Sequence, residues 1–417
     1  MIKLLKFILL ILLVVSHQSF ANPSEGRKLF VEKRCVTCHV IGRGKFVGPD
    51  LWKVGNKYSK QDLIQWISNT DKLYEKYESR PINKGYPPMP NMNLSTSETL
   101  RIIDYIDSLK NKIKPNSSVL LEGRVRNFSD DSKEEYEIKL ESVMAEKIIS
   151  EKNVKTKDGY FKLKDLKGNI AYRVKILHDG IEYSTDKFYY MPEENIKDVN
   201  LTVYNSTQEK EVVEIKSSHM VISYDEANNN LLFAEIYNIN NISKNIYVGY
   251  NSLIEDQRKV LRFSKYKDIE DLSFPHRSLE TFIVSDDSII ETIPLPPGER
   301  RVVFTYSKKL NFLGANLTKN FYNNIDSLTI IVPENKINML IEGLEFTKSK
   351  SDIKELSDQS YVTYSIDFIK IGDEINLEFN KDFQSLISQR SFITIIFILV
   401  VTLILIYLYK KKLLRIK

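Results

Sequence analysis

The chain of 417 residues contains very little cysteine and histidine, with two residues of the first kind and five of the second. The two cysteines, Cys35 and Cys38, are close neighbours, so no disulfide framework is available to hold an exported protein of this size together. A zinc site built on this pair would need two further ligands, and no other cysteine exists to supply them. Of the histidines, His17 lies in the leader described below, and three others in strand-like segments are interpreted as surface or structural residues: His178, His219 and His276.

The first 21 residues have the charged, apolar and small-residue order of a secretory signal peptide. Lys3 and Lys6 precede an apolar run, and Ser19-Phe20-Ala21 supplies a cleavage site after Ala21. An uncleaved signal anchor is the alternative. We therefore expect residues 1–21 to be a signal peptide. The two neighbouring cysteines would then enter an oxidising compartment, where their presence requires a specific chemical role.

Long apolar runs are otherwise scarce, and the one near the C-terminus is long enough to span a membrane. Phe392 to Tyr409 is interrupted only by two threonines, and its helical length of roughly 27 Å is close to the hydrocarbon thickness of a bilayer. Basic residues follow at once over 410–417, and the positive-inside rule places them in the cytoplasm. The sequence thus predicts a transmembrane helix over 391–409 in the bacterial inner (cytoplasmic) membrane, single-pass, with the preceding domains in the periplasm.

The two cysteines belong to the sequence Cys35-Val36-Thr37-Cys38-His39, which suggests a chemical role for the pair. Two thiols at this spacing can add to the two vinyl groups of a haem, and the adjacent imidazole can bind its iron from the proximal side. A redox dithiol is the main alternative, but it usually belongs to a thioredoxin-like βαβ pattern, which is absent. Covalent haem attachment is therefore the favoured interpretation.

Five separated patterns surround this motif. Ser24 can cap a helix that runs through Gly26, Leu29 and Phe30, and a second helix carries Leu63, Ile64, Trp66 and Ile67. The other patterns are Gly48-Pro49-Asp50-Leu51, Tyr86-Pro87-Pro88-Met89-Pro90, and a last helix opened by Leu94-Ser95 with apolar residues at Ile102, Ile103, Tyr105, Ile106 and Leu109. Over residues 24 to 112 this order resembles the class I (monohaem) cytochrome c family, an all-α fold.

The resemblance implies a role for each matching residue. Cys35 and Cys38 would hold one haem c by thioether bonds, and His39 would be the proximal iron ligand. The carbonyl of Pro49 would accept the other ring N–H of His39 and fix its tautomer. Met89, directly before a proline, would be the distal ligand.

The resemblance leaves two further assignments open. Met92 is the alternative distal ligand, although it is expected to pack under the last helix. Trp66 matches an aromatic residue that often reaches a haem propionate, and a core tryptophan is the equal alternative. Gly26 would let the first helix cross the last one closely, with Phe30 and Tyr105 packing at the crossing.

The net charge of +5 is unevenly distributed. Residues 23–114 carry 17 Lys or Arg and 10 Asp or Glu, a net charge of +7, whereas residues 115–409 carry −9. A basic cytochrome steers towards acidic redox partners, and the acidic modules can also attract it back onto themselves. A merely solvated lysine-rich surface is the alternative.

The remaining residues form short apolar-alternating segments separated by turn signals, which predict β-sandwich modules. After a linker at 113–118, residues 119–199 resemble the carboxypeptidase regulatory-like (prealbumin-type) module through Gly123-x-Val125, Asp158-Gly159-x-Phe161 and Tyr172-x-Val174. Residues 200–387 are predicted to form one or two further β-rich modules without a catalytic constellation. The expected fold class is thus multidomain: a helical domain at 22–112, β-sandwich modules and one C-terminal transmembrane helix.

The favoured function is a membrane-anchored carrier of single electrons by outer-sphere transfer, not an enzyme, alone or as the electron-transfer subunit of an oxidoreductase complex. Its partners would be redox proteins such as a cytochrome complex, reductase or oxidase, with no nucleic acid and no small-molecule substrate. The alternative is a partner- or glycan-binding or assembly protein with an accessory or sensory haem. A peroxidase or gas-binding protein is disfavoured, because the Pro-Met-Pro loop would fill the distal iron position.

Overall fold

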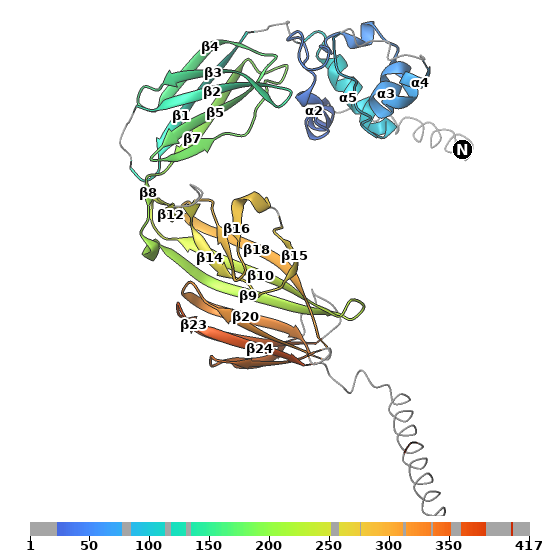
Figure 1. Cartoon of the computed structure of the whole chain (residues 1–417). Helices are drawn as coiled ribbons and strands as arrows, with labels where there is room; N and C mark the ends of the chain where they lie inside the picture. Colours follow the sequence, from blue (N-terminus) through green and yellow to red (C-terminus); the bar gives the residue numbers. More distant parts are fainter. Residues whose placement is uncertain are drawn as a thin grey trace, which may run out of the picture. The chain divides into compact units, whose positions relative to one another are not determined.

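The computed structural model describes residues 23–76, 85–112, 118–130, 135–251, 258–275, 277–311, 314–334, 337–351, 360–380 and 402. The chain separates into two compact units, residues 1–204 and 205–417. Among the described residues, the α-helices with assigned bounds lie in the first part of the first unit, and the rest of both units consists mainly of strands (Figure 1). A helical N-terminal domain followed by a large β-sheet region is the multidomain arrangement that the sequence predicts.

Several predicted segments cannot be compared with this structure. The signal peptide over 1–21 and nearly all of the linker over 113–118 lie outside the described residues, as does His276. Within the described ranges, no helix combines the length and the apolar character that a membrane crossing requires. The segment 391–409, for which a transmembrane helix is predicted, lies outside those ranges apart from Thr402.

The helical domain contains four α-helices and two short 3₁₀ turns among its described residues. They are α2 (Pro23–Glu32), η1 (Cys35–Thr37), η2 (Val54–Asn56), α3 (Lys60–Ser68), α4 (Thr70–Lys76) and α5 (Thr96–Ser108). Helix α5 begins with a capping box, in which the Ser95 hydroxyl accepts from the Glu98 N–H and the Glu98 carboxylate accepts from the Ser95 N–H. Ser59 caps α3 in the same way through the Asp62 N–H. These local signals explain why α3 and α5 begin where they do. The prediction that Ser24 caps the first helix is wrong, because α2 includes Pro23 and Ser24 therefore lies inside the helix.

Helices α2 and α5 cross closely, and a glycine makes the crossing possible. A Cβ atom at Gly26 would overlap the carbonyl of Arg101 and lie 2.7 Å from the Cβ of Tyr105. The rings of Phe30 and Tyr105 pack at the crossing with centroids 5.8 Å apart, and both side chains are buried. This confirms the predicted roles of all three residues. An exposed ion pair between Lys33 and Glu98, with N and O 2.8 Å apart, also joins the two helices.

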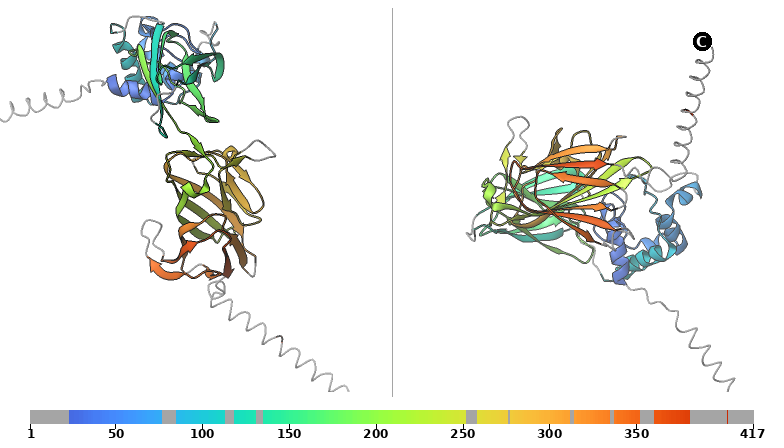
Figure 2. Two further views of the ribbon diagram at one scale, coloured as in Figure 1. Left: turned by 90° about the vertical axis from the view of Figure 1, so that its left-hand side faces the viewer. Right: turned by 90° about the horizontal axis from the view of Figure 1, so that it is seen from below.

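The first β-module completes the first unit, beside the helices (Figures 1 and 2). Its two facing sheets have the strand orders β4-β1-β7 and β3-β2-β5-β6. Both sheets contribute to one buried cluster that includes Leu121, Phe161 and Val174, as expected for a sandwich. The strands are β1 (Ser118–Asn127), β2 (Glu137–Met144), β3 (Lys147–Lys155), β4 (Tyr160–Lys167), β5 (Ala171–His178), β6 (Ile181–Ser184) and β7 (Ile196–Val203).

The predicted boundary between the β-modules at 199/200 is wrong, because β7 continues across it. Strand β7 pairs in parallel with β1, from Leu120 opposite Ile196 to Asn127 opposite Val203. Leu201 is buried in the cluster of the first module. The boundary therefore lies after residue 203, and a parallel pairing over such a long separation leaves no local sequence signal.

The second unit is one β-sandwich with a single large buried cluster, which resolves the predicted choice between one and two modules. Its largest sheet has the order β15-β18-β10-β9-β20-β23-β22, and the smaller sheets β14-β17-β16 and β19-β24-β21 also contribute residues to the cluster (Figure 2). The long strands are β9 (Val213–Asp225), β10 (Asn230–Asn241), β18 (Gly298–Lys309), β20 (Ile325–Pro333) and β23 (Tyr361–Ile369). The shorter ones are β8 (Ser206–Thr207), β11 (Ile246–Tyr247), β12 (Tyr250–Asn251), β13 (Arg258–Lys259), β14 (Leu261–Ser264), β15 (Glu270–Ser273), β16 (Phe282–Val284), β17 (Ser288–Glu291), β19 (Ala315–Asn320), β21 (Asn338–Glu342), β22 (Thr347–Ser351) and β24 (Glu374–Asn380), with 3₁₀ turns η3 (Lys210–Val212) and η4 (Leu279–Thr281).

A fully buried ion pair lies in the core of this sandwich. The Lys319 ammonium is 2.9 Å from both carboxylate oxygens of Glu235 and donates to the Ser264 carbonyl at 3.1 Å. The hydroxyls of Tyr237 and Tyr306 donate to the same carboxylate at 2.7 and 2.6 Å. These bonds offset the cost of burying two charges, so the pair is interpreted as structural.

Candidate haem-attachment site

The two cysteines and the histidine lie on a single tight turn that follows α2. Arg34 adopts a left-handed conformation with φ 60°, which ends the helix and turns the chain into η1. The His39 N–H then donates to the Cys35 carbonyl at 2.9 Å, and the Cys38 N–H approaches the same carbonyl at 3.2 Å. This turn brings residues three and four positions apart onto one side of the chain, as attachment to a single flat ring requires.

The surroundings of the cysteine pair disfavour a redox dithiol. Both residues are free and half-buried. Burial raises the pKa of the Cys35 thiol to about 11, whereas reactive redox cysteines have a lowered pKa. A buried thiol with a raised pKa is a poor nucleophile for repeated thiol exchange, so the site does not resemble a redox dithiol.

The orientation of His39 is set by the loop that follows it. Its Nδ1 lies 2.9 Å from the Pro49 carbonyl oxygen, the distance that the expected hydrogen bond requires, which leaves Nε2 free to bind iron. A Cβ atom at Gly48 would lie 2.7 Å from the imidazole Cε1, so only glycine fits behind the ring. Burial lowers the pKa of His39, and the imidazole therefore stays neutral, which is the form that binds a metal.

A carboxylate closes the base of this loop. Asp50 accepts hydrogen bonds from the backbone N–H groups of Gly42 and Gly44, each at 2.7 Å, and from that of Trp52 at 2.8 Å. The Gly48 N–H also donates to the Cys38 carbonyl at 2.6 Å. The resemblance gave Asp50 no role, yet these bonds fix the backbone that presents Pro49 to His39.

The proline-rich loop that carries Met89 is held by α4 and the end of α3. The Thr70 hydroxyl lies 3.1 Å from the Pro90 carbonyl and 3.0 Å from the Trp66 carbonyl, and the Met89 N–H donates to the Tyr74 hydroxyl at 3.3 Å. Met92 packs against the buried cluster of the helical domain, as expected of a structural residue, whereas Met89 is not part of that cluster. Because Cys35 also packs against this cluster, the packing does not separate the two methionines, and the prediction of Met89 as the distal ligand rests on its place directly before Pro90.

Both tryptophans of the chain have a buried indole nitrogen that lacks a hydrogen-bond partner among the described residues. A buried indole N–H usually finds an acceptor, so Trp52 and Trp66 indicate that a group with acceptor oxygens belongs beside them. The propionate carboxylates of a haem fit this requirement. Sequence reasoning missed Trp52, although it directly follows the Gly48-Pro49-Asp50-Leu51 pattern.

The structure brings the predicted residues together in two groups. Cys35, Cys38, His39 and Pro49 are joined by the hydrogen bonds of the proximal loop, and Trp66 and the Met89 loop are joined through Thr70. Cys35, Trp52 and Met92 all pack against the same buried cluster. Within the described ranges, no group of three or more His, Cys, Asp or Glu side chains gathers that could hold a bare metal ion.

Comparison with known proteins agrees with this geometry. Residues 23–110 match the model of the cytochrome c family. Cytochrome c-551 of Pseudomonas denitrificans is 36% identical over 88 residues, which are 100% of that protein and 21% of this chain. A cytochrome c-553-like protein of Synechocystis sp. (strain ATCC 27184 / PCC 6803 / Kazusa) is 24% identical over 88 residues, which are 70% of that protein and 21% of this chain.

A likeness to a solved structure was also found outside that family. Legionella pneumophila aminopeptidase A, in complex with aspartic acid, matches 40% of this chain and 21% of its own chain, with 11% identity and a TM-score of 0.24. The chain thus spans about a fifth of that enzyme, and a likeness this weak carries no argument about activity.

Proposed function

The chain belongs to the cytochrome c family through residues 23–110, and from that premise we propose that it is a membrane-anchored, extracytoplasmic carrier of single electrons between respiratory redox proteins. The family and the Cys35-Val36-Thr37-Cys38-His39 motif imply one covalently attached haem c with its iron. The observation that supports the proposal is that His39 is held by the Pro49 carbonyl and that Met89 lies on a separate loop held by Tyr74. If both side chains bind the iron, no position on the metal is left for a substrate.

Different residues of the site would hold different parts of the haem. Bound haem iron supplies reversible one-electron chemistry, and ligation by His and Met raises its potential. His39, kept neutral and held by Pro49, would bind the iron without needing to gain or lose a proton. The indole N–H groups of Trp52 and Trp66 are placed to bind acceptor oxygens. The proposed function requires no residue to act as an acid, base or nucleophile.

Spectroscopy of two methionine variants tests the ligand assignment. The oxidised protein should show the sulfur-to-iron absorption band at the red end of the visible spectrum. Met89→Ala should abolish it, and Met92→Ala, the matched control, should retain it because Met92 packs in the core. Carbon monoxide should not bind the reduced wild type. A band that survives in Met89→Ala, or binding of carbon monoxide, would contradict a closed iron.

The membrane anchor rests on the sequence of residues 391–417. Deletion of 391–417 should release the haem-stained protein from the membrane fraction into the soluble fraction. Deletion of 410–417 alone is the matched control and should leave it in the membrane, since the apolar run remains. Haem staining of the denatured polypeptide after electrophoresis identifies the protein in both fractions. Release by the control deletion as well would count against a spanning helix.

The redox partners are proposed from charge alone. The helical domain is basic, with 17 Lys or Arg and 10 Asp or Glu over residues 23–114, so acidic partners should be attracted to it. Oxidation by a partner, followed by stopped-flow absorbance, should slow as ionic strength rises. Co-purification from detergent-solubilised membranes would identify the partner. A rate independent of salt would argue against electrostatic docking.

A further inference from the structure

A segment of the first β-module forms part of the haem domain. Residues 189–195, which we call the strap, precede β7 and lie against the helical domain within the first unit. Met191 of the strap is 7% exposed and belongs to the same buried cluster as Phe30, Ile41 and Tyr105. The ring of Tyr189 meets that of Phe46 edge-on, with centroids 6.3 Å apart. The core of the haem domain is therefore completed by a side chain from the β-module.

Arg43 is the polar centre of this contact. Its side chain is almost fully buried, and its Nη2 donates to the Met191 carbonyl at 3.0 Å and to the Glu194 carbonyl. The Pro192 carbonyl and the Asn195 amide oxygen surround the same nitrogen at 3.4 Å. A buried guanidinium needs such a set of acceptors, because an unpaired buried charge is costly.

Charge and shape match on both sides of the contact. Arg27 of the haem domain forms an ion pair with Glu194 of the strap at 3.2 Å, and the Tyr105 hydroxyl donates to Glu193 at 3.3 Å, so both acidic residues of the strap have partners in the haem domain. A Cβ atom at Gly168 would lie 2.8 Å from the Cδ of Arg43. The arginine can thus cross this point of the β-module only because Gly168 has no side chain.

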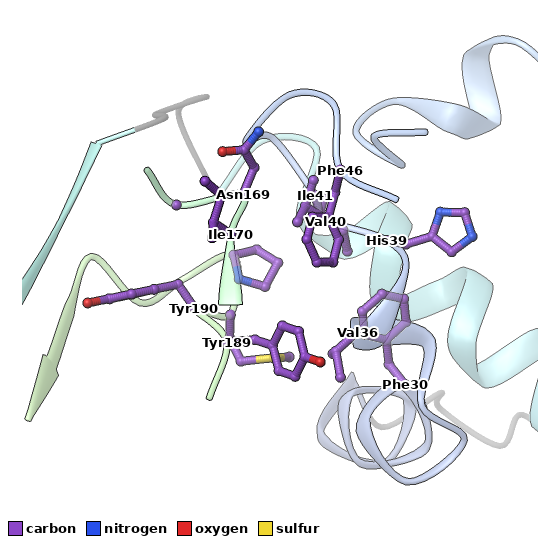
Figure 3. Close-up of a pocket in the computed structure, with 13 residues that line it drawn as sticks. Phe30, Val36, His39, Val40, Ile41, Phe46, Asn169, Ile170, Tyr189 and Tyr190 are labelled. Atoms are coloured by element: carbon purple, nitrogen blue, oxygen red, sulfur yellow. The ribbon is translucent and has the colours of Figure 1, made fainter. Parts of the chain in front are cut away.

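The strap contacts the loop that orients His39, not His39 itself. Figure 3 shows the His39 ring pointing away from Tyr189 and Tyr190, whereas the ring of Phe46 meets that of Tyr189 edge-on. Arg43 stands in the middle of the loop that Asp50 closes through the N–H groups of Gly42 and Gly44. The strap is therefore connected to the proximal ligand through the loop backbone.

The same loop also reaches the distal side. The Asn169 side chain of the β-module donates to the Lys45 carbonyl, and the Lys45 ammonium lies 4.9 Å from the ring centroid of Tyr86. Tyr86 opens the proline-rich segment that carries Met89. Contacts from the β-module thus extend to both ligand-bearing loops.

We propose that Arg43 is a positioning residue through which the first β-module holds the His39 loop, so that the module sets the properties of the haem. The helical domain and the module then form one haem-binding unit, in which the strap packs against the loop that orients His39. The proposal goes beyond electron transfer, since it does not depend on which protein receives the electron.

Two variants, one in each part of the contact, test this in the full-length, haem-loaded chain. Arg43→Gln removes the charge that the strap surrounds. Gly168→Ala changes no residue of the haem domain, but it displaces the Arg43 side chain. Arg101→Gln is the matched control, because Arg101 pairs with Glu25 at the surface of the same domain.

Hydrogen exchange and the reduction potential are the readouts. In both test variants, the amide hydrogens of Gly42 and Gly44 should exchange at least tenfold faster, and the potential should rise because the Pro49 bond to His39 weakens. The control should change neither. Unchanged exchange and potential in Gly168→Ala would overturn the proposal, even if Arg43→Gln fails to fold. Normal haem staining in all variants separates this outcome from a failure of haem attachment.

Discussion

The space behind His39 offers a sharp test of the proximal site, through the substitution Gly48→Ala. The added Cβ atom would lie 2.7 Å from Cε1 and 2.9 Å from Nδ1 of the imidazole, and 3.1 Å from the Cys38 carbonyl. Unbonded carbon atoms pack at roughly 3.5–4.0 Å, so the ring must retreat by about 1 Å. That shift takes Nδ1, now 2.9 Å from the Pro49 oxygen, beyond hydrogen-bonding distance.

The cost of this substitution follows from two contributions. Overpacking costs about 1–3 kcal/mol, and the lost hydrogen bond contributes about 1 kcal/mol more. We therefore expect Gly48→Ala to lower the free energy of unfolding by roughly 2–4 kcal/mol. A weaker bond to Nδ1 also makes His39 a poorer donor to iron, so the reduction potential should rise.

Denaturant unfolding of the haem-loaded chain measures this loss, followed by haem absorbance so that the first unit is observed by itself. Gly55→Ala is the matched control, because its Cβ atom would meet only the ends of two flexible side chains, the Asp107 carboxylate at 2.9 Å and the Lys110 ammonium at 3.2 Å. Equal stability and equal reduction potential in Gly48→Ala and the wild type would refute the inference that only glycine fits behind the His39 ring.

Three further substitutions probe contacts away from the iron ligands. Lys33 and the capping box lower the pKa of Glu98 to about 2, so Glu98→Gln should reduce stability at pH 7 by a margin that is lost as the pH falls from about 4.5 to 2, as urea titrations at each pH would show. Gly26→Ala should lower the free energy of unfolding by about 1–3 kcal/mol by forcing the helices apart; an unchanged midpoint would contradict the crossing. Lys319→Met should destabilise the second unit by about 3–5 kcal/mol, and adding Glu235→Leu should recover only part of the loss, because the buried Tyr237 and Tyr306 hydroxyls then lose their acceptor; calorimetry can compare both.

The helices and the proximal motif were predictable because their causes are local. The serine before α5 and the spacing of the two cysteines act within a few residues, and each is visible in the sequence, whereas the role of Gly26 at the α2 crossing was expected from the family resemblance. Helix α4 was not predicted, since its seven residues, Thr70–Lys76, have no clear apolar period. Strand β3 was also missed, because almost all of its residues are exposed and it alternates no apolar side chains.

The parts that sequence reasoning could not predict depend on contacts between distant segments. Nothing near Arg43 indicates that its partners follow about 150 residues later, and nothing near Trp52 indicates that its nitrogen is buried without an acceptor. The parallel pairing of β1 with β7 likewise joins the two ends of a module. Such pairings depend on the complete fold, so they cannot be predicted from short stretches of the sequence.

The position of the strap directly before β7 has a consequence for the order of assembly. During synthesis the haem-binding turn emerges long before residues 189–195, and the first module cannot close until β7 is available to pair with β1. The cysteines therefore pass through a period in which their loop is formed only by nearby residues and remains open to the attachment machinery. A chain truncated before β7 would therefore keep the haem-binding turn but lack the pairing that closes the module.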